Sequence, residues 1–235
     1  PAAGWGSWLA VEMMRATVRD DDPFERLADC IDALPDDVRD PFATTLHPAW
    51  SPDQPAPSNG SVWGCLAQAV WAFRRTNNFA DAVVTAIELG GDTDTVACVT
   101  GALAGARYGI QGIPSRWVTY VHGRVDTPEG TVEYRADHLQ QMAYRLLGVA
   151  DRPETPPEPA AGPVEVAPSL HAADLVGANG VPTDWAVVSL CRTRARFDAH
   201  PVRRQVFLID EPERELNPNL DHAVRDAVDA VDAFL

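Results

Sequence analysis

Cysteine is scarce in this 235-residue chain, and its pattern excludes two kinds of site. The four cysteines are Cys30, Cys65, Cys98 and Cys191, and none of them belongs to a Cys-x-x-Cys pair. Zinc sites and disulfide frameworks both depend on closely spaced or regularly paired cysteines, so neither is predicted. We expect the four thiols to pack as small apolar side chains, Cys98 included.

Long apolar runs and an excess of positive charge are also missing. No stretch approaches the roughly 20 apolar residues of a membrane helix, and no secretory signal is visible. The formal net charge of -15 disfavours binding to nucleic acids or anionic membranes through bulk electrostatics, although Arg203 and Arg204 could together hold one phosphate. The sequence therefore predicts a cytoplasmic protein without a nucleic-acid or membrane partner.

What the sequence does contain is a dense group of oxygen ligands in the run Gly90-Gly91-Asp92-Thr93-Asp94-Thr95. Its two glycines let the backbone approach a ligand closely, and hard oxygen ligands suit Mg²⁺. An Asp can cap a helix, and residues three apart share a helix face, so Asp92 and Thr95 should face the same way. Asp94 could then bridge two cations. We predict a magnesium site here, against the alternative of a capped helix with solvated acids.

The residues around this turn extend the pattern. Two helical segments, 66–73 and 79–87, precede it. The small-residue run that follows contains Gly101-Ala102, Gly105-Ala106 and Gly109, and then come Ile113-Pro114 and Trp117. With these motifs, residues 1–148 resemble the C-terminal half of the ADP-ribosylglycohydrolase family, most specifically between Gly60 and Trp117.

This resemblance implies an all-helical fold in which two Mg²⁺ ions position ADP-ribose and a water. The glycosidic bond at the ribose anomeric carbon, N- or O-linked, would be hydrolysed in an ADP-ribosylated protein or a small ADP-ribosyl compound. Asp92, Asp94 and Thr95 match metal ligands of the family, and the two aspartates are also the catalytic candidates. Gly90 and Gly91 are the candidate ligand-binding glycines.

The resemblance also implies residues that this chain does not contain. The first half of the family fold contributes a Gly-Asp motif, a Thr-Asp-Asp metal motif and an acidic residue near the scissile bond, and none of them is found here. The chain begins at Pro1, without an initiator Met, inside a predicted helix. An amphipathic run from Leu220 reaches Leu235 without a stop signal. We therefore expect an incomplete piece of a longer protein.

Apolar periodicity predicts a mainly α-helical first region. The expected helices cover residues 5–18, 23–33, 62–75, 79–89, 93–108 and 134–147. Residues 40–59 are rich in Pro, Ser and Asp and are predicted to form a loop.

Several residues near this loop are candidates for ligand contact. Trp50, Trp63, Trp71 and Trp117 could stack on adenine, although Trp71 and Trp117 are assigned to packing. His47 and the Asn59-Gly60 pair are left outside the predicted site, because a solvated histidine and a plain turn are the simpler interpretations.

A proline-rich segment divides the chain. Residues 149–169 contain Pro153, Pro156, Pro157, Pro159, Pro163 and Pro168 and are predicted to form an extended linker after the helical domain of residues 1–148. Beyond it, residues 185–191 and 204–210 predict buried strands, and residues 220–235 a helix. Residues 170–235 resemble, less specifically, the start of a dual-specificity protein phosphatase, which implies a partial α/β domain.

The phosphatase resemblance lacks the phosphate-binding loop. Cys191 has no Arg six residues later, so we expect it to pack at a strand end rather than to act as a nucleophile. Asp210 is the candidate for the general acid, against a plain loop carboxylate. Three functions remain open: a magnesium-dependent glycohydrolase, a non-catalytic ADP-ribose-binding module, and a phosphatase whose Cys-x-x-x-x-x-Arg loop follows Leu235. The first is favoured.

Overall fold

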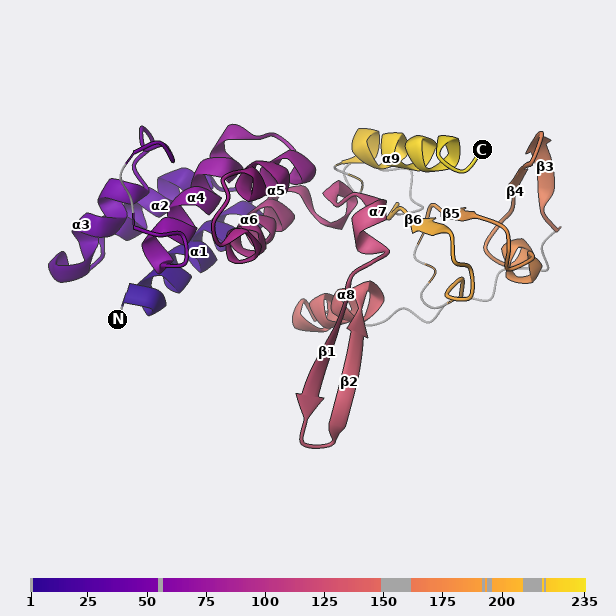
Figure 1. The fold of residues 1–235 in the computed structure, drawn as a ribbon, viewed down its shortest axis with the longest axis horizontal. Coiled ribbons are helices and arrows are strands. Elements are labelled where there is room, and N and C mark those ends of the chain that lie inside the picture. The colour runs from indigo at the N-terminus through magenta and orange to yellow at the C-terminus, as the bar shows by residue number, and fades with distance from the viewer. Residues whose placement is uncertain are drawn as a thin grey trace. The chain divides into compact units, whose positions relative to one another are not determined.

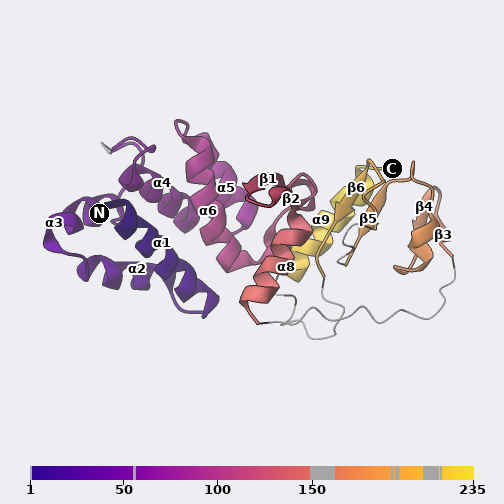
Figure 2. The same cartoon turned by 90° about the horizontal axis from the view of Figure 1, so that it is seen from below.

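The computed structural model describes residues 2–54, 57–148, 162–191, 193, 196–208, 217 and 219–235. The chain divides into two compact units, Pro1–Ile113 and Pro114–Leu235. In its described residues the first unit is helical, whereas the second combines helices with two-stranded sheets (Figures 1 and 2).

The first unit is a bundle of helices. Its elements are α1 (Ala2–Val18), α2 (Pro23–Asp32), α3 (Asp36–Thr45), α4 (Val62–Arg75), α5 (Phe79–Glu88) and α6 (Thr93–Tyr108), followed by a 3-10 turn at Ile110–Gly112. Helix α6 packs against α1, α4 and α5, while α2 packs against α1 and α3 (Figure 1). The expectation of a mainly helical fold is confirmed, and all five helices predicted within this unit lie within three residues of their expected bounds.

Side-chain caps explain where three of these helices begin. Asp22 accepts hydrogen bonds from the N–H groups of Phe24 and Glu25 at the start of α2. Ser61 caps α4, and Asn78 caps α5. Each cap satisfies a backbone N–H that has no partner within its helix.

Small side chains fill the core between α4, α5 and α6. The buried cluster consists of Cys65, Ala69, Ala72, Ala86 and Val96, with Trp71 and Val99 packed against it. Alanines let the helix axes approach closely, and the expected packing role of Trp71 is confirmed.

Helix α3 (Asp36–Thr45) contradicts the prediction of a loop for residues 40–45, whereas residues 46–54 and 57–59 lie outside helices and strands as expected. The helix continues to Thr45 although Pro41 lies inside it, a position where proline removes one helical hydrogen bond. Phe42 is fully buried and packs its ring 6.2 Å from that of Trp63. Burial of this aromatic side chain outweighs the local cost of proline, which is why local composition misled the prediction.

The expectation that all four thiols pack is wrong for Cys98. Cys30 and Cys65 are buried and Cys191 is half-buried, but Cys98 is exposed. Helix α6 buries the stripe that includes Val96 and Thr100. Cys98 lies midway between Val96 and Thr100 in the sequence, so its side chain points to the opposite side of the helix, toward solvent.

The second unit begins with a short helix and a hairpin that the sequence analysis did not predict. After α7 (Ser115–Val118), strands β1 (His122–Thr127) and β2 (Gly130–Arg135) pair antiparallel through a two-residue turn (Figure 1). Tyr134 and Arg135 pair with β1, so α8 (Ala136–Leu146) begins two residues later than expected.

The rest of the second unit contains two small sheets and the last helix. Strands β3 (Val164–Ala167) and β4 (Leu170–Ala172) pair antiparallel, and a 3-10 turn follows at Gly177–Gly180. Strands β5 (Val187–Ser189) and β6 (Arg203–Gln205) pair in parallel, and α9 (Leu220–Asp232) packs near them through Val206, Ala223 and Ala227.

These elements only partly match the predictions for residues 149–235. Strand β3 lies inside the segment predicted to be a linker, whereas most of that segment, residues 149–161, lies outside the described residues, as does Asp210. Strands β5 and β6 are shorter than the apolar runs suggested. Among the described helices, none combines the length and the apolar character needed to cross a membrane.

Candidate functional site

The turn between α5 and α6 carries the predicted ligands. Gly90 has φ 73° and Gly91 has φ 72°, so both occupy the left-handed region that side chains other than glycine rarely adopt. Two such residues in succession reverse the chain after α5 and bring Asp92 to the position immediately before α6.

The two aspartates of the turn lie close to each other. The pKa of Asp94 lies below its usual range. The largest cause is a hydrogen bond with the side chain of Asp92, and the next is a hydrogen bond from the backbone N–H of Thr95. Asp94 and Thr95 are exposed and Asp92 is half-buried. Asp94 is therefore a carboxylate at neutral pH, and its neighbour is within reach of the same ligand.

The structure corrects the role predicted for Asp92 as a helix cap. Asp92 occupies the N-cap position of α6, but its side chain accepts no capping hydrogen bond. Its φ and ψ angles of -82° and 69° differ from the extended conformation typical of a capping residue, and its carboxyl instead interacts with Asp94. The carboxyl oxygens of Asp92 are therefore not committed to the helix end.

Asn59, which the sequence analysis left outside the site, holds this turn in place. Its Nδ2 donates to the carbonyl oxygen of Gly90 at 2.8 Å, and its Oδ1 accepts from the backbone N–H of Asp92 at 3.1 Å. The same Nδ2 donates to Oε1 of Gln68, on α4, at 2.9 Å. Asn59 is only 9% exposed. The one sequence signal was an Asn-Gly pair just before a helix, which is also the signature of an ordinary turn.

A small cavity of about 250 Å³ lies beside the turn. Trp50, Asn59, Gln68, Leu89, Gly90 and Gly91 are among the residues that line it. The indole N–H of Trp50 is buried and has no hydrogen-bond partner among the described residues. His47, the other loop residue considered, accepts a hydrogen bond from the backbone N–H of Ala49 through Nδ1, which is a local turn contact.

The donor set of the turn suits a hard cation but is small. Asp92 and Asp94 form no ion pair with an arginine in the described part of the chain, so their charge is not neutralised there. In that same part, no group of three or more His, Cys, Asp and Glu side chains is placed to hold a metal ion. Two carboxylates and a hydroxyl fit Mg²⁺ as a partial set, because this ion usually keeps several waters and takes few protein ligands.

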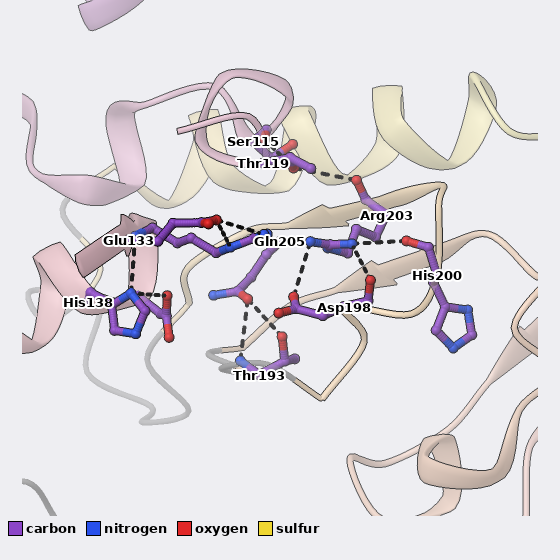
Figure 3. A network of polar contacts seen from close by, with 11 residues as sticks. Ser115, Thr119, Glu133, His138, Thr193, Asp198, His200, Arg203 and Gln205 are labelled. Carbon is purple, nitrogen blue, oxygen red and sulfur yellow. Dashed lines mark hydrogen bonds and ion pairs between the residues drawn. The ribbon is translucent and has the colours of Figure 1, made fainter. Parts of the chain in front are cut away.

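The second unit contains a larger cavity, of about 500 Å³, with a polar lining. Arg203 donates to the backbone carbonyls of Asp198 and His200 and pairs with the Asp198 carboxylate at 3.1 Å (Figure 3). Across the cavity lining, Glu133 is shared by Arg124 and Arg135. Two guanidinium groups thus share one carboxylate, and the described lining holds four arginines against the carboxylates of Glu133, Asp137 and Asp198.

The arginine pair considered for a phosphate is occupied by internal contacts. Arg203 is paired with Asp198 as described, and the guanidinium of Arg204 lies 5.4 Å from the ring centroid of Phe234. Neighbouring residues of a strand point to opposite faces, which fits these two different surroundings.

Comparison with known proteins gives the family. The family model described as ADP-ribosylglycohydrolase matches residues 1–156, about two thirds of the chain and including the whole Gly90–Thr95 turn. This chain belongs to the ADP-ribosylglycohydrolase family. The finer assignment to the C-terminal half of the family fold stays a prediction, and the comparisons give no evidence for a phosphatase-like domain at residues 170–235.

Curated proteins named as ADP-ribosyl hydrolases are similar to parts of the chain. ADP-ribosylarginine hydrolase Tri1 of Pseudomonas putida (strain GB-1) is 47% identical over 90 residues, covering 38% of this chain and 21% of the relative. ADP-ribosylhydrolase ARH3 of Danio rerio is 51% identical over 64 residues, covering 27% and 15%. The matched part therefore spans about a fifth or less of these relatives. No solved structure matches the chain.

Proposed function

We propose that the Gly90–Thr95 turn forms part of an active site that hydrolyses ADP-ribosyl glycosidic bonds with Mg²⁺. Family membership supports the reaction class, and relatives named as ADP-ribosylarginine hydrolase and ADP-ribosylhydrolase support the substrate class. The observation that carries the proposal is the adjacent pair Asp92 and Asp94, which has no cationic partner among the described residues and lies on a turn fastened by Asn59.

Each residue of the turn would have a distinct task. Asp92, Asp94 and the hydroxyl of Thr95 would hold the metal, with further ligands from outside this group. When bound, Mg²⁺ supplies charge stabilisation and makes a coordinated water easier to deprotonate. Gly90 presents backbone without a side chain and has open space where a Cβ would lie, so a sugar could approach the carboxylates closely there, whereas the corresponding space at Gly91 is filled by Asn59. The ribose hydroxyls would be oriented next to the bond that breaks.

The substrate we propose is ADP-ribose linked to a protein or to a small compound, with the arginine linkage as the first to test. The experiment measures release of ADP-ribose from an ADP-ribosylated arginine substrate in Mg²⁺ and in EDTA. Asp92→Asn and Asp94→Asn should each lower the rate about a hundredfold or more, the size expected when charge stabilisation of a transition state is lost. Asp40→Asn, which changes an exposed carboxylate of α3 outside the Gly90–Thr95 turn, is the control and should keep the full rate. Equal rates in all variants would reject the proposed site.

A second candidate is a module that binds ADP-ribose without cleaving it. The absence of a third acidic ligand near Asp92 and Asp94, within the described residues, favours it for this chain taken alone. Metal-dependent binding of ADP-ribose with no turnover would support this candidate, whereas metal-dependent turnover would reject it. The phosphatase alternative, which needs a Cys-x-x-x-x-x-Arg loop, is favoured by no observation in the described structure.

A further inference from the structure

We propose that Asn59 is a positioning residue for the metal ligand Asp92, and that Gln68 in turn fixes Asn59. This inference rests on the proposed function, because it assigns these two amides a role toward the metal proposed there. Neither side chain needs to touch metal or substrate. Their effect would pass through the backbone of the Gly90–Thr95 turn.

The hydrogen bonds at residue 59 require a side chain that both donates and accepts, as an amide does. The backbone N–H of Asp92 needs an acceptor, which Oδ1 provides, and the carbonyl of Gly90 needs a donor, which Nδ2 provides. Nδ2 uses its second hydrogen for Gln68. An aspartate could not donate to Gly90 or Gln68, and an alanine could do neither. Asn59 thus bonds to the backbone on both sides of Gly91 and defines the path of the chain into Asp92.

Asn59 is itself held in a tight turn ahead of α4. The carbonyl oxygen of Ser58 accepts from the Ser61 hydroxyl at 2.6 Å and from the Ser61 backbone N–H at 2.8 Å. Gly64 lies so close beneath this segment that an added Cβ would overlap the carbonyl oxygens of Pro57 and Ser58. The loop is therefore pressed onto the first turn of α4, which leaves Asn59 little freedom before any ligand binds.

The contact between the two segments is close enough to transmit a displacement. A Cβ added to Gly91 would lie 2.5 Å from Oδ1 of Asn59, and one added to Gly60 would lie 3.5 Å from Oδ2 of Asp92. The Asn59-Gly60 backbone thus runs beside the carboxyl group as well as beside the turn. If Asn59 moved, Asp92 would lose both its hydrogen bond and the surface that limits its carboxyl group.

Gln68 connects this arrangement to the core. It lies on α4 between Ala67 and Ala69, both of which are almost fully buried. Its Oε1 accepts from Asn59 at 2.9 Å, and the residue is half-buried beside the cavity. The second Nδ2 hydrogen of Asn59 is thereby satisfied by a helix that cannot shift easily. Outer-shell partners of this kind typically change metal affinity about 10- to 100-fold when they are removed.

The first test measures amide hydrogen exchange at Asp92 in the metal-free chain. The Asp92 N–H should be protected, and Asn59→Ala should speed its exchange about tenfold or more, the equivalent of one lost hydrogen bond. Gln68→Met, which removes the acceptor at similar length, should have a smaller effect in the same direction. Gln68→Glu keeps an acceptor and should restore the protection. Asn77→Ala, at an exposed asparagine away from the turn, is the control.

The second test measures Mg²⁺ affinity of the same variants by titration with the metal alone. Asn59→Ala and Gln68→Met should weaken binding about 10- to 100-fold, while Gln68→Glu and Asn77→Ala stay near the parent value. Faster exchange at Asp92 with unchanged Mg²⁺ affinity would overturn the positioning role. If Asn59→Ala does not fold, the comparison of Gln68→Met with Gln68→Glu tests the positioning role without it. A parent chain that binds no Mg²⁺ would reject the metal site of the proposed function, a result distinct from failure of the variants.

Discussion

At the scale of single residues, the turn depends on two backbone conformations that glycine adopts readily. Gly90→Ala would place a Cβ on a residue with φ 73°, where no other atom lies within 4 Å of it. The substitution should therefore lower the free energy of unfolding only by the strain of a left-handed residue, about 1–2 kcal/mol. Gly91→Ala adds an overlap with Asn59 and should cost more. Urea unfolding of the two variants measures the difference, which tests the closeness of Asn59 to the turn.

The double variant Asn59→Ala/Gly91→Ala supplies the control for that comparison. Removing the Asn59 side chain removes the overlap, so the extra cost of Gly91→Ala over Gly90→Ala should disappear in this background. A cost at Gly91 that does not depend on residue 59 would contradict the described contact.

Sequence reasoning found the ligands of the turn but not the residue that holds them. Asp92, Asp94 and Thr95 could be recognised because their donors lie within four positions, and their role as ligands stays a prediction. Asn59 could not be recognised, because its partners Gly90 and Asp92 lie 31 and 33 residues away along the chain. Local patterns carry no information on contacts over such distances.

At the scale of elements, α1 and α2 are joined through a buried carboxylate. Glu12 accepts from Arg15 at 2.6 Å and from Nε of Arg26 at 3.0 Å, and Arg26 also contacts it through Nη2. The hydrogen bond from Arg26 lowers the pKa of Glu12, against the opposing effect of burial. The ion pair should therefore stabilise the first unit most when Glu12 is ionised.

This ion pair predicts an acid-sensitive first unit. Because the pKa of Glu12 is lower in the folded state, its contribution is present above the unfolded-state pKa of about 4.3 and is lost as the pH falls through the folded value. Between pH 7 and pH 3, the midpoint of thermal unfolding should fall less for Glu12→Gln than for the parent chain. Glu88→Gln, at an exposed position of α5, should behave as the parent; an identical pH dependence for Glu12→Gln would count against the prediction.

Helix α3 supplies the second prediction at this scale. Phe42→Ala should lower the free energy of unfolding by about 3–5 kcal/mol, since this fully buried ring fills the space beside Trp63. Val84→Ala, at a position of α5 that is 40% exposed, should change it by about 0.5 kcal/mol or less. Similar small effects of both substitutions in urea unfolding would mean that α3 does not pack as described.

The elements that sequence reasoning missed share one property. Helix α3 contains Pro41, and the β1–β2 hairpin has exposed residues on nearly its whole length, so neither shows the periodic apolar pattern that reveals a helix or a half-buried strand. The helices α4, α5 and α6 do show it, and they were predicted almost to the residue.

At the scale of the whole molecule, the contacts divide the chain after Ile113. The backbone N–H of Ser115 donates to Asp226 of α9 at 2.8 Å, and the Thr119 hydroxyl donates to the Arg203 carbonyl at 3.4 Å, so α7 packs with the later elements. From the sequence, we predicted the domain boundary at the prolines of residues 149–169. A proline-rich composition indicates a linker, whereas composition carries no information on contacts such as that of Ser115 with Asp226. The family match extends to residue 156, across this contact boundary.

The proposed function requires that Asp92, Asp94 and Thr95 bind ADP-ribose through Mg²⁺. Isothermal titration of ADP-ribose into this chain, with Mg²⁺ and with EDTA, tests it most directly, with Asp94→Asn as the site variant and Asp40→Asn as its control. We expect binding in Mg²⁺ that EDTA abolishes and that Asp94→Asn weakens at least about tenfold, because a charged ligand is lost. Binding that is equal in Mg²⁺ and EDTA, or unchanged in Asp94→Asn, would contradict it.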